Sequence, residues 1–101
     1  MKTVVSVRGR LKGDEAQAKR DHDATVDKLI PVSRPLGAVG HQAFLNPQDR
    51  GEFMAIDTWN SMEGLQKFMG DPNTQAEIGK LFESQPSVSV WVESGWRSFQ
   101  D

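Results

Sequence analysis

Two histidines are the side chains of this sequence best suited to proton transfer, because an imidazole exchanges its proton near neutral pH. His22 falls on the apolar side of a predicted helix and should point toward a sheet rather than toward solvent. There it could remove a proton from a bound molecule, provided that a partner fixes its tautomer. The alternative is a histidine that is hydrogen-bonded at the edge of the core. His22 is therefore the first candidate for a catalytic residue.

His41 and Asp57 are the other polar candidates, and each falls in a predicted strand. His41 could line a ligand pocket or a dimer contact, or it could be a half-exposed strand residue. Asp57 interrupts an apolar strand, and a buried carboxylate is costly without a partner. A salt bridge to Arg8 or Arg97 is the structural interpretation of Asp57, and a general base is the catalytic one. We assign Asp57 to catalysis with His22, and His41 to substrate binding.

A metal ion is the remaining possibility for these side chains. Two imidazoles and one carboxylate, if they converge, supply enough ligands for a metal. The chain contains neither an HxH nor an HExxH pattern, and it contains no cysteine, which excludes thiolate ligands and disulfides. We therefore predict no metal site and no cofactor.

Apolar side chains that could accept an aromatic ligand recur in the second half of the chain. In a domain this small the same side chains can serve as core and as pocket wall. The candidates for substrate binding are Trp59, Phe68, Met69, Phe82 and Trp91.

The segment 52–71 should organise the fold that positions these residues. Residues 53–56 are consecutive apolar residues, which is typical of a strand covered on both faces. Asn60 and Glu63 predict a capping box at the start of a helix that Gly70 ends. The apolar residues of this helix recur at helical spacing: Met62, Leu65, Phe68 and Met69.

The other segments complete the order β-α-β-β-α-α-β, which is the split βαβ pattern of an α+β, ferredoxin-like fold with a four-stranded antiparallel sheet. Its central strands should be the first and the third. The first half of the chain should form a strand over 3–8 and a helix from its cap Asp14 to about Ile30, which Pro31 stops. A strand over 38–45, in which Val39 shares a face with His41, should lead into a hairpin turn over 46–51. After the segment 52–71 we expect a helix that begins with Asp71 and Pro72, and a strand over 87–92.

Helices on one face of a four-stranded sheet leave the other face exposed, and an apolar face of that size rarely stays in contact with water. We predict that a second copy covers it, so that the paired sheets of a two-fold homodimer close into a barrel. The alternative is a monomer whose second face is polar enough, with help from Ser6, Arg8 and Thr58. The length of 101 residues fits one domain over 1–101.

The balance of 12 Lys and Arg against 14 Asp and Glu gives no electrostatic case for nucleic acid or an anionic membrane. The apolar run near the N-terminus is too short for a signal peptide, and no segment has transmembrane length. We expect a cytoplasmic protein.

The strand end Asp57-Thr58-Trp59, followed by the residues 61–65 (SMEGL) and a two-part helix, resembles the antibiotic biosynthesis monooxygenase (ABM) superfamily of dimeric α+β barrels. The resemblance covers essentially the full chain and implies a homodimer with a pocket between the sheet and helices of each subunit. Some members are cofactor-independent oxygenases that act on polycyclic aromatic substrates, others degrade haem, and many have no known reaction.

The haem-degrading branch carries an Asn–Trp–His set, and only Trp59 matches it. The position of its histidine falls near Phe68 and Met69, and residues 3–10 contain no asparagine. The resemblance therefore favours a cofactor-independent monooxygenase-like protein for a small apolar or aromatic molecule. In that reaction His22 would abstract a proton, and the substrate carbanion would react with dioxygen. The alternatives are a ligand-binding or stress-related homodimer without turnover, and a structural partner module.

Overall fold

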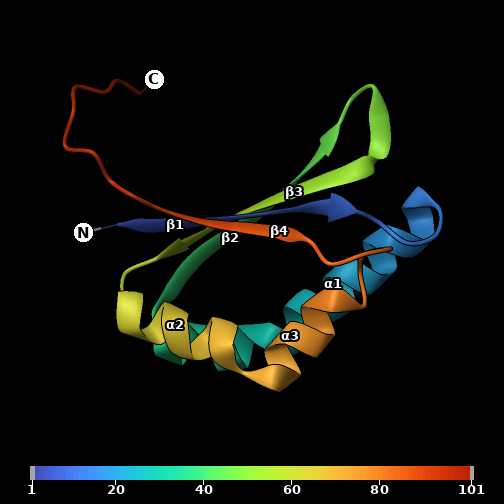
Figure 1. Cartoon of the computed structure of the whole chain (residues 1–101), viewed down its shortest axis with the longest axis horizontal. Helices are drawn as coiled ribbons and strands as arrows, with labels where there is room; N and C mark the ends of the chain where they lie inside the picture. The colour runs from blue at the N-terminus through green and yellow to red at the C-terminus, as the bar shows by residue number, and fades with distance from the viewer. Residues whose placement is uncertain (1, 101) are drawn as a thin grey trace.

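Alternation of apolar residues along the strands and caps at the helix starts determine the elements of this chain (Figure 1). The structure, a computed structural model, describes residues 2–100. The elements are β1 (Thr3–Arg10), α1 (Glu15–Ser33), a short 3-10 helix η1 (Arg34–Leu36), β2 (Ala38–Asn46), β3 (Asp49–Trp59), α2 (Met62–Gly70), α3 (Pro72–Gly79) and β4 (Ser87–Val92).

The four strands form one antiparallel sheet in the order β2-β3-β1-β4, so the predicted ferredoxin-like α+β fold with β1 and β3 at the centre is confirmed. Figure 1 shows α1, α2 and α3 together on one face of the sheet. The core lies between these two layers, where Val5 and Ala55 from the central strands meet Leu65 and Phe68 of α2. Along the described chain, no helix is both long and apolar enough to cross a membrane.

Two helix boundaries differ from the prediction. The cap of α2 is Ser61 rather than Asn60, because the Ser61 hydroxyl accepts a hydrogen bond from the Gly64 amide at 2.9 Å. α1 continues through Pro31 to Ser33. A proline removes one helical hydrogen bond, here the bond to the carbonyl of Asp27. Asp27 is exposed to water near the end of the helix, so its carbonyl can bond to water instead.

The other predicted caps are confirmed. Asp14 accepts a hydrogen bond from the Gln17 amide at 2.8 Å and begins α1. Asp71 accepts from the Asn73 amide at 3.1 Å, with Pro72 as the first residue of α3.

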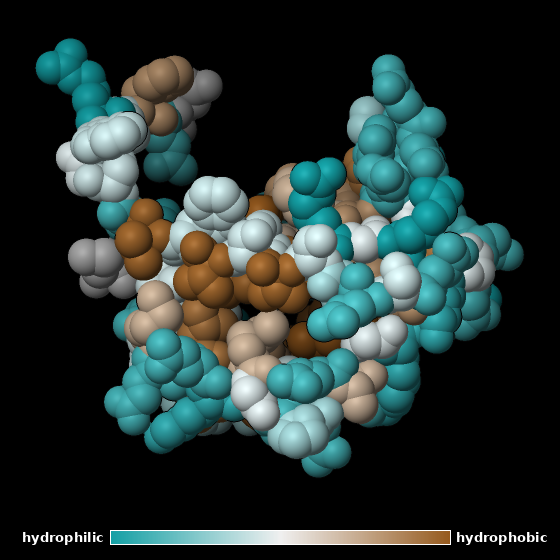
Figure 2. All heavy atoms as spheres, viewed as in Figure 1, coloured by the Kyte–Doolittle hydropathy of each residue, from teal (hydrophilic) through white to brown (hydrophobic). Residues whose placement is uncertain are grey.

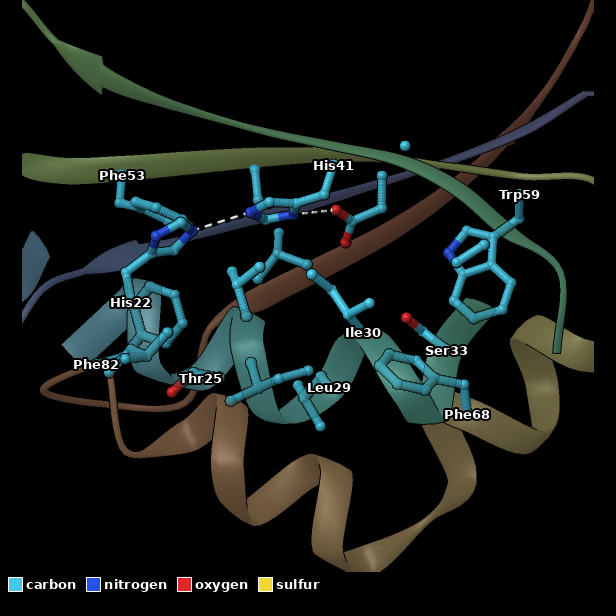
Figure 3. A pocket seen from close by; sticks show the side chains of 18 residues that line it. His22, Thr25, Leu29, Ile30, Ser33, His41, Phe53, Trp59, Phe68 and Phe82 are labelled. Atoms are coloured by element: carbon cyan, nitrogen blue, oxygen red, sulfur yellow. Dashed lines mark hydrogen bonds and ion pairs between the residues drawn. The ribbon is translucent and has the colours of Figure 1, made fainter. Parts of the chain in front are cut away.

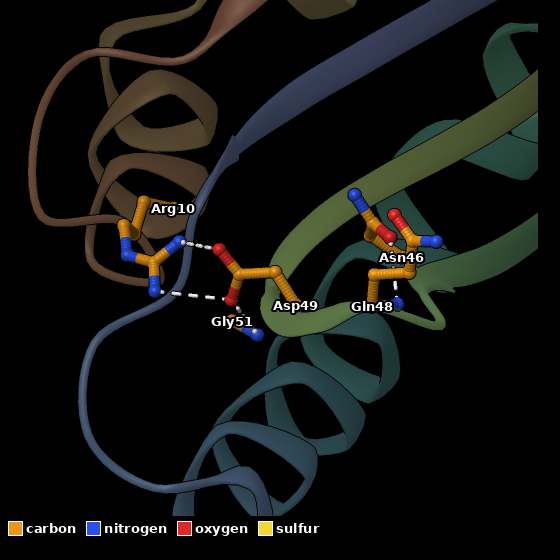
Figure 4. Close-up of polar contacts among 5 residues, drawn as sticks. All are labelled: Arg10, Asn46, Gln48, Asp49 and Gly51. Carbon is orange, nitrogen blue, oxygen red and sulfur yellow. Dashed lines mark hydrogen bonds and ion pairs between the residues drawn. The ribbon is translucent and has the colours of Figure 1, made fainter.

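The β2–β3 hairpin is fixed by polar contacts at its tip (Figure 4). The Arg10 guanidinium donates two hydrogen bonds to the Asp49 carboxylate, at 2.8 and 3.1 Å, and the Gln48 amide donates to the Asn46 side chain at 2.9 Å. The bond from Arg10 lowers the pKa of Asp49 below its usual value. The Arg10–Asp49 contact ties β3 to β1, and the bond to Asn46 holds the turn between β2 and β3.

Two surfaces of the sheet carry exposed apolar side chains. On the face opposite the helices, Phe44 and Trp91 are exposed and Met54 and Ile56 are half-buried. Along the β4 edge, Val88, Val90 and Val92 are also exposed, and apolar side chains gather over this part of the molecule in Figure 2. Within residues 2–100 no helix lies on the first of these surfaces.

Candidate active site

A cavity of about 110 Å³ lies between the sheet and the helices. Its wall is largely apolar, with Phe53 and Trp59 from β3, Leu29 from α1 and Phe68 from α2 (Figure 3). The lining residues that reach solvent are Ile30 of α1 and Gly40 and His41 of β2. The mouth of the cavity therefore lies between the C-terminal half of α1 and the edge strand β2.

Four polar side chains form a continuous chain of contacts along this cavity. His41 Nδ1 lies 2.5 Å from Asp57 Oδ1, and His41 Nε2 lies 2.9 Å from His22 Nε2. At the other end, His22 Nδ1 lies 3.0 Å from Asp23 Oδ1. Figure 3 shows the two imidazoles pointing toward one another from α1 and β2. We call this set the Asp23–His22–His41–Asp57 chain.

The sheet register and the packing of α1 bring these residues together. His41 lies directly opposite Asp57 in the β2–β3 ladder, so their side chains share the face that the helices cover. The His22 ring packs on Phe53, with ring centroids 5.6 Å apart. The prediction that Val39 shares the face of His41 is wrong, because a β-bulge between Ala38 and Gly40 breaks the alternation and leaves Val39 half exposed.

The hydrogen-bond pattern fixes where the protons lie. An ionised carboxylate only accepts hydrogen bonds, so Asp57 and Asp23 each require a proton on the Nδ1 atom that faces them. The two Nε2 atoms face each other and can then share one proton. Without a proton on either Nε2 atom the contact has no donor, and with a proton on both it has no acceptor. With both carboxylates ionised, this geometry fits a His22–His41 pair that carries one shared proton and a single positive charge.

Electrostatics favour that charge on His41. The hydrogen bond to Asp57 raises the pKa of His41 above its usual value, and the negative charge of Asp57 acts in the same direction, whereas burial opposes both. At the other end, the pKa of Asp23 is lowered, first by its hydrogen bond with Lys19 and then by that with His22.

Six of the eight predicted site residues line the cavity: His22, His41, Asp57, Trp59, Phe68 and Phe82. Met69 does not line it and packs at the margin of the core instead. Trp91 lies on the opposite face of the sheet, where its Nε1 donates a hydrogen bond to Ser6 Oγ at 3.1 Å. The proposed salt bridge from Asp57 to Arg8 or Arg97 is absent from the described residues, since the partner of Asp57 is His41.

Asp23 is the site residue that the sequence did not reveal, because the helical pattern predicts only that it faces water. Its carboxylate does so in part, but it also reaches back to its neighbour His22. The adjacent positions of a histidine and an acidic residue were the available signal.

Among residues 2–100, no three His, Cys, Asp or Glu side chains are grouped so that they would hold a metal ion.

Comparison with known proteins shows the fold. No protein-family model matches the chain, and no curated protein matches its sequence. Among solved structures, SnoaB, a cofactor-independent oxygenase from Streptomyces nogalater, matches with a TM-score of 0.73 and 14% identity over 94% of this chain and 95% of that chain. A protein from Bordetella bronchiseptica, assigned provisionally to the antibiotic biosynthesis monooxygenases, matches with a TM-score of 0.68 and 11% identity over 91% and 96%. The chain has the ferredoxin-like α+β fold of these proteins.

A third match bears on assembly. A dimeric ferredoxin-like protein of unknown function from Jannaschia sp. CCS1 matches with a TM-score of 0.66 and 16% identity over 92% of this chain and 100% of that chain. Chains similar in fold to this one therefore include a dimeric protein and a cofactor-independent oxygenase.

Proposed function

We propose that this protein is a cofactor-independent, monooxygenase-like enzyme that removes a proton from a small aromatic or apolar molecule in the cavity. The single observation that carries the proposal is the His22–His41 pair, which lies at an apolar cavity and is held at both ends by carboxylates. The similarity in fold to a cofactor-independent oxygenase supports the oxygen chemistry.

Asp57 makes His41 a stronger base than a free imidazole by raising its pKa, and His41 lies in contact with His22. Without the shared proton, two nitrogen lone pairs face each other at 2.9 Å and repel. Accepting one proton replaces that repulsion with an N–H···N hydrogen bond, and the Asp57 carboxylate stabilises the resulting charge. The pair in its observed geometry is thus the form that exists after it has taken a proton.

The reaction balances without an external reductant. A C–H bond of a CH₂ group next to an aromatic ring breaks, its proton moves to Nε2, and the electron pair remains on the substrate as a carbanion. The carbanion carbon forms a C–O bond with dioxygen, which is reduced to the peroxide level, and the peroxide takes back the proton. The O–O bond and the second C–H bond then break with loss of water, which leaves a carbonyl group. One oxygen atom enters the product and the other leaves as water.

The size of the cavity indicates the size of the substrate. An apolar protein cavity of roughly 150 Å³ accommodates benzene. The volume of about 110 Å³ found here suits a single aromatic ring, with any larger part of the ligand extending through the mouth.

We also propose that the protein is a homodimer that buries the apolar face of the sheet opposite the helices. The exposed Phe44 and Trp91 and the half-buried Met54 and Ile56 lie on this face. A second copy of the same face is its simplest cover.

Replacement of His22 tests the catalytic role. A panel of single-ring compounds with an acidic CH₂ group is screened for oxygen consumption without added flavin or metal. General-base catalysis contributes roughly 10²–10⁴-fold, so we expect His22→Gln to lower kcat by about that factor while ligand affinity is kept. Gln17→Glu, on the exposed side of α1, is the control and should leave the rate unchanged. Undiminished turnover in His22→Gln would contradict the proposal.

The alternative function is a homodimer that binds a small molecule without turnover, and the largely apolar wall of the cavity would serve it equally well. Calorimetry with the same panel distinguishes the two. Binding without oxygen consumption by the unmodified protein would favour the non-catalytic function.

A further inference from the structure

The C-terminal arm, residues 93–100, leaves the sheet after β4 and carries two aromatic side chains into solvent. Trp96 is 83% exposed and Phe99 is 96% exposed. Gly95 takes a φ of 74°, which turns the arm away from the line of β4. In Figure 1 the arm rises on the side of the sheet opposite the helices, which is where a second copy would lie.

A second group of exposed apolar residues lies at the other edge of the sheet. We call it the β2-side patch. It includes Val39 on the bulge of β2 and residues near the C-terminal end of α1, and its members are Ile30, Val32 and Val39. Ile30 also lines the mouth of the cavity.

We propose that the C-terminal arm of each subunit lies across the β2-side patch of its partner and covers the mouth of the partner's cavity with Trp96 and Phe99. This inference rests on the homodimer of the proposed function. A two-fold interface requires surfaces that complement each other, and each contact occurs twice. The chain supplies both surfaces, an aromatic arm at one edge of the sheet and an apolar patch at the other.

Two properties of the β2 side fit an extended segment from another copy. As an edge strand, β2 has an outer row of backbone groups without strand partners, and an added chain can bond to such a row. His41 is 34% exposed at the mouth, so an aromatic cover would exclude water from the His22–His41 pair. Each active site would then be complete only in the dimer.

Introduced cysteines test this contact, because the chain has none of its own. Tagged Val39→Cys chains are mixed with untagged Phe99→Cys chains and oxidised mildly. Val90→Cys is the matched control, since Val39 and Val90 are both on edge strands and are 50% and 49% exposed. We expect the Val39→Cys and Phe99→Cys pair to form the disulfide-linked heterodimer at least about tenfold faster than the Val90→Cys and Phe99→Cys pair.

Sedimentation of the unmodified protein separates the two ways in which the inference can fail. If the protein is a dimer and Phe99→Cys links to Val90→Cys, or to neither valine position, the placement of the arm is overturned and the homodimer stands. If the protein is a monomer, both the arm contact and the homodimer are overturned. Neither result changes the expected effect of His22→Gln on proton abstraction.

Discussion

At the scale of single residues, the site depends on two carboxylates that fix the tautomers of two histidines. Asp57 orients His41 from the neighbouring strand, and Asp23 orients His22 from the adjacent position on α1. Sequence reasoning identified His22, His41 and Asp57 but assigned Asp57 to the wrong ion-pair partner. Which imidazole nitrogen faces which carboxylate depends on strand register and on helix rotation, and a single sequence does not define either with that accuracy.

Replacement of Asp57 should change the pH dependence of stability. Because the pKa of His41 is raised in the folded protein, its stabilising contribution is complete below the pKa of the unfolded chain and is lost as pH rises through the folded value. We expect Asp57→Asn to lower the free energy of unfolding more at about pH 6 than at about pH 9, because His41 loses its proton as the pH rises. Urea unfolding at both pH values measures the difference. A larger loss at the higher pH would contradict the assignment.

At the scale of elements, the sequence pattern predicted every strand and α-helix, but neither their ends nor the short helix η1. The pattern predicted a cap at Asn60 and a stop at Pro31, whereas α2 is capped by Ser61 and α1 ends at Ser33. α1 passes Pro31 because the carbonyl of Asp27 can bond to water instead, whereas the start of α2 lies where α2 and η1 pack closely, which is a tertiary contact. The bulge at Val39 also belongs to this category, because only the pairing with β3 reveals the extra residue.

The close approach of α2 to η1 makes Gly64 irreplaceable. A Cβ atom at this position would lie 1.6 Å from the carbonyl oxygen of Leu36, so the two elements would have to separate. We expect Gly64→Ala to lower the free energy of unfolding by about 3 kcal/mol or more. Gly79→Ala is the control, because a Cβ there meets nothing within 4 Å, and it should be neutral or slightly stabilising. Thermal unfolding of both variants checks this, and similar melting temperatures would contradict the packing described.

At the scale of the whole molecule, the helices lie on one face of the sheet, and within residues 2–100 no helix lies on the other. The sequence predicted the exposed face from the number of strands and helices, and the structure locates it over Phe44, Trp91, Met54 and Ile56. The course of the C-terminal arm could not be predicted, because aromatic residues after a strand have no periodicity that indicates what they contact.

A charge on the open face should prevent assembly without unfolding the subunit. Trp91 is 59% exposed, so Trp91→Glu costs little core packing but places a carboxylate in the proposed interface. We expect the dimer dissociation constant to rise by about a hundredfold, with an unchanged circular dichroism spectrum. Gln66→Glu, on the exposed side of α2, is the matched control for the added charge. Equal dissociation constants for the two variants would place the interface elsewhere.

The central claim is that His22 and His41 share one proton between their Nε2 atoms, and ¹⁵N NMR of the imidazoles across a pH titration tests it most directly. We expect the Nε2 signal of His41 to titrate at a pH above 6.5, the usual value for histidine, because Asp57 raises the pKa of His41, and we expect scalar coupling across the hydrogen bond between the two Nε2 atoms. No coupling between the two Nε2 atoms, or an unprotonated Nδ1 facing either carboxylate, would contradict the shared proton and the base proposed from it.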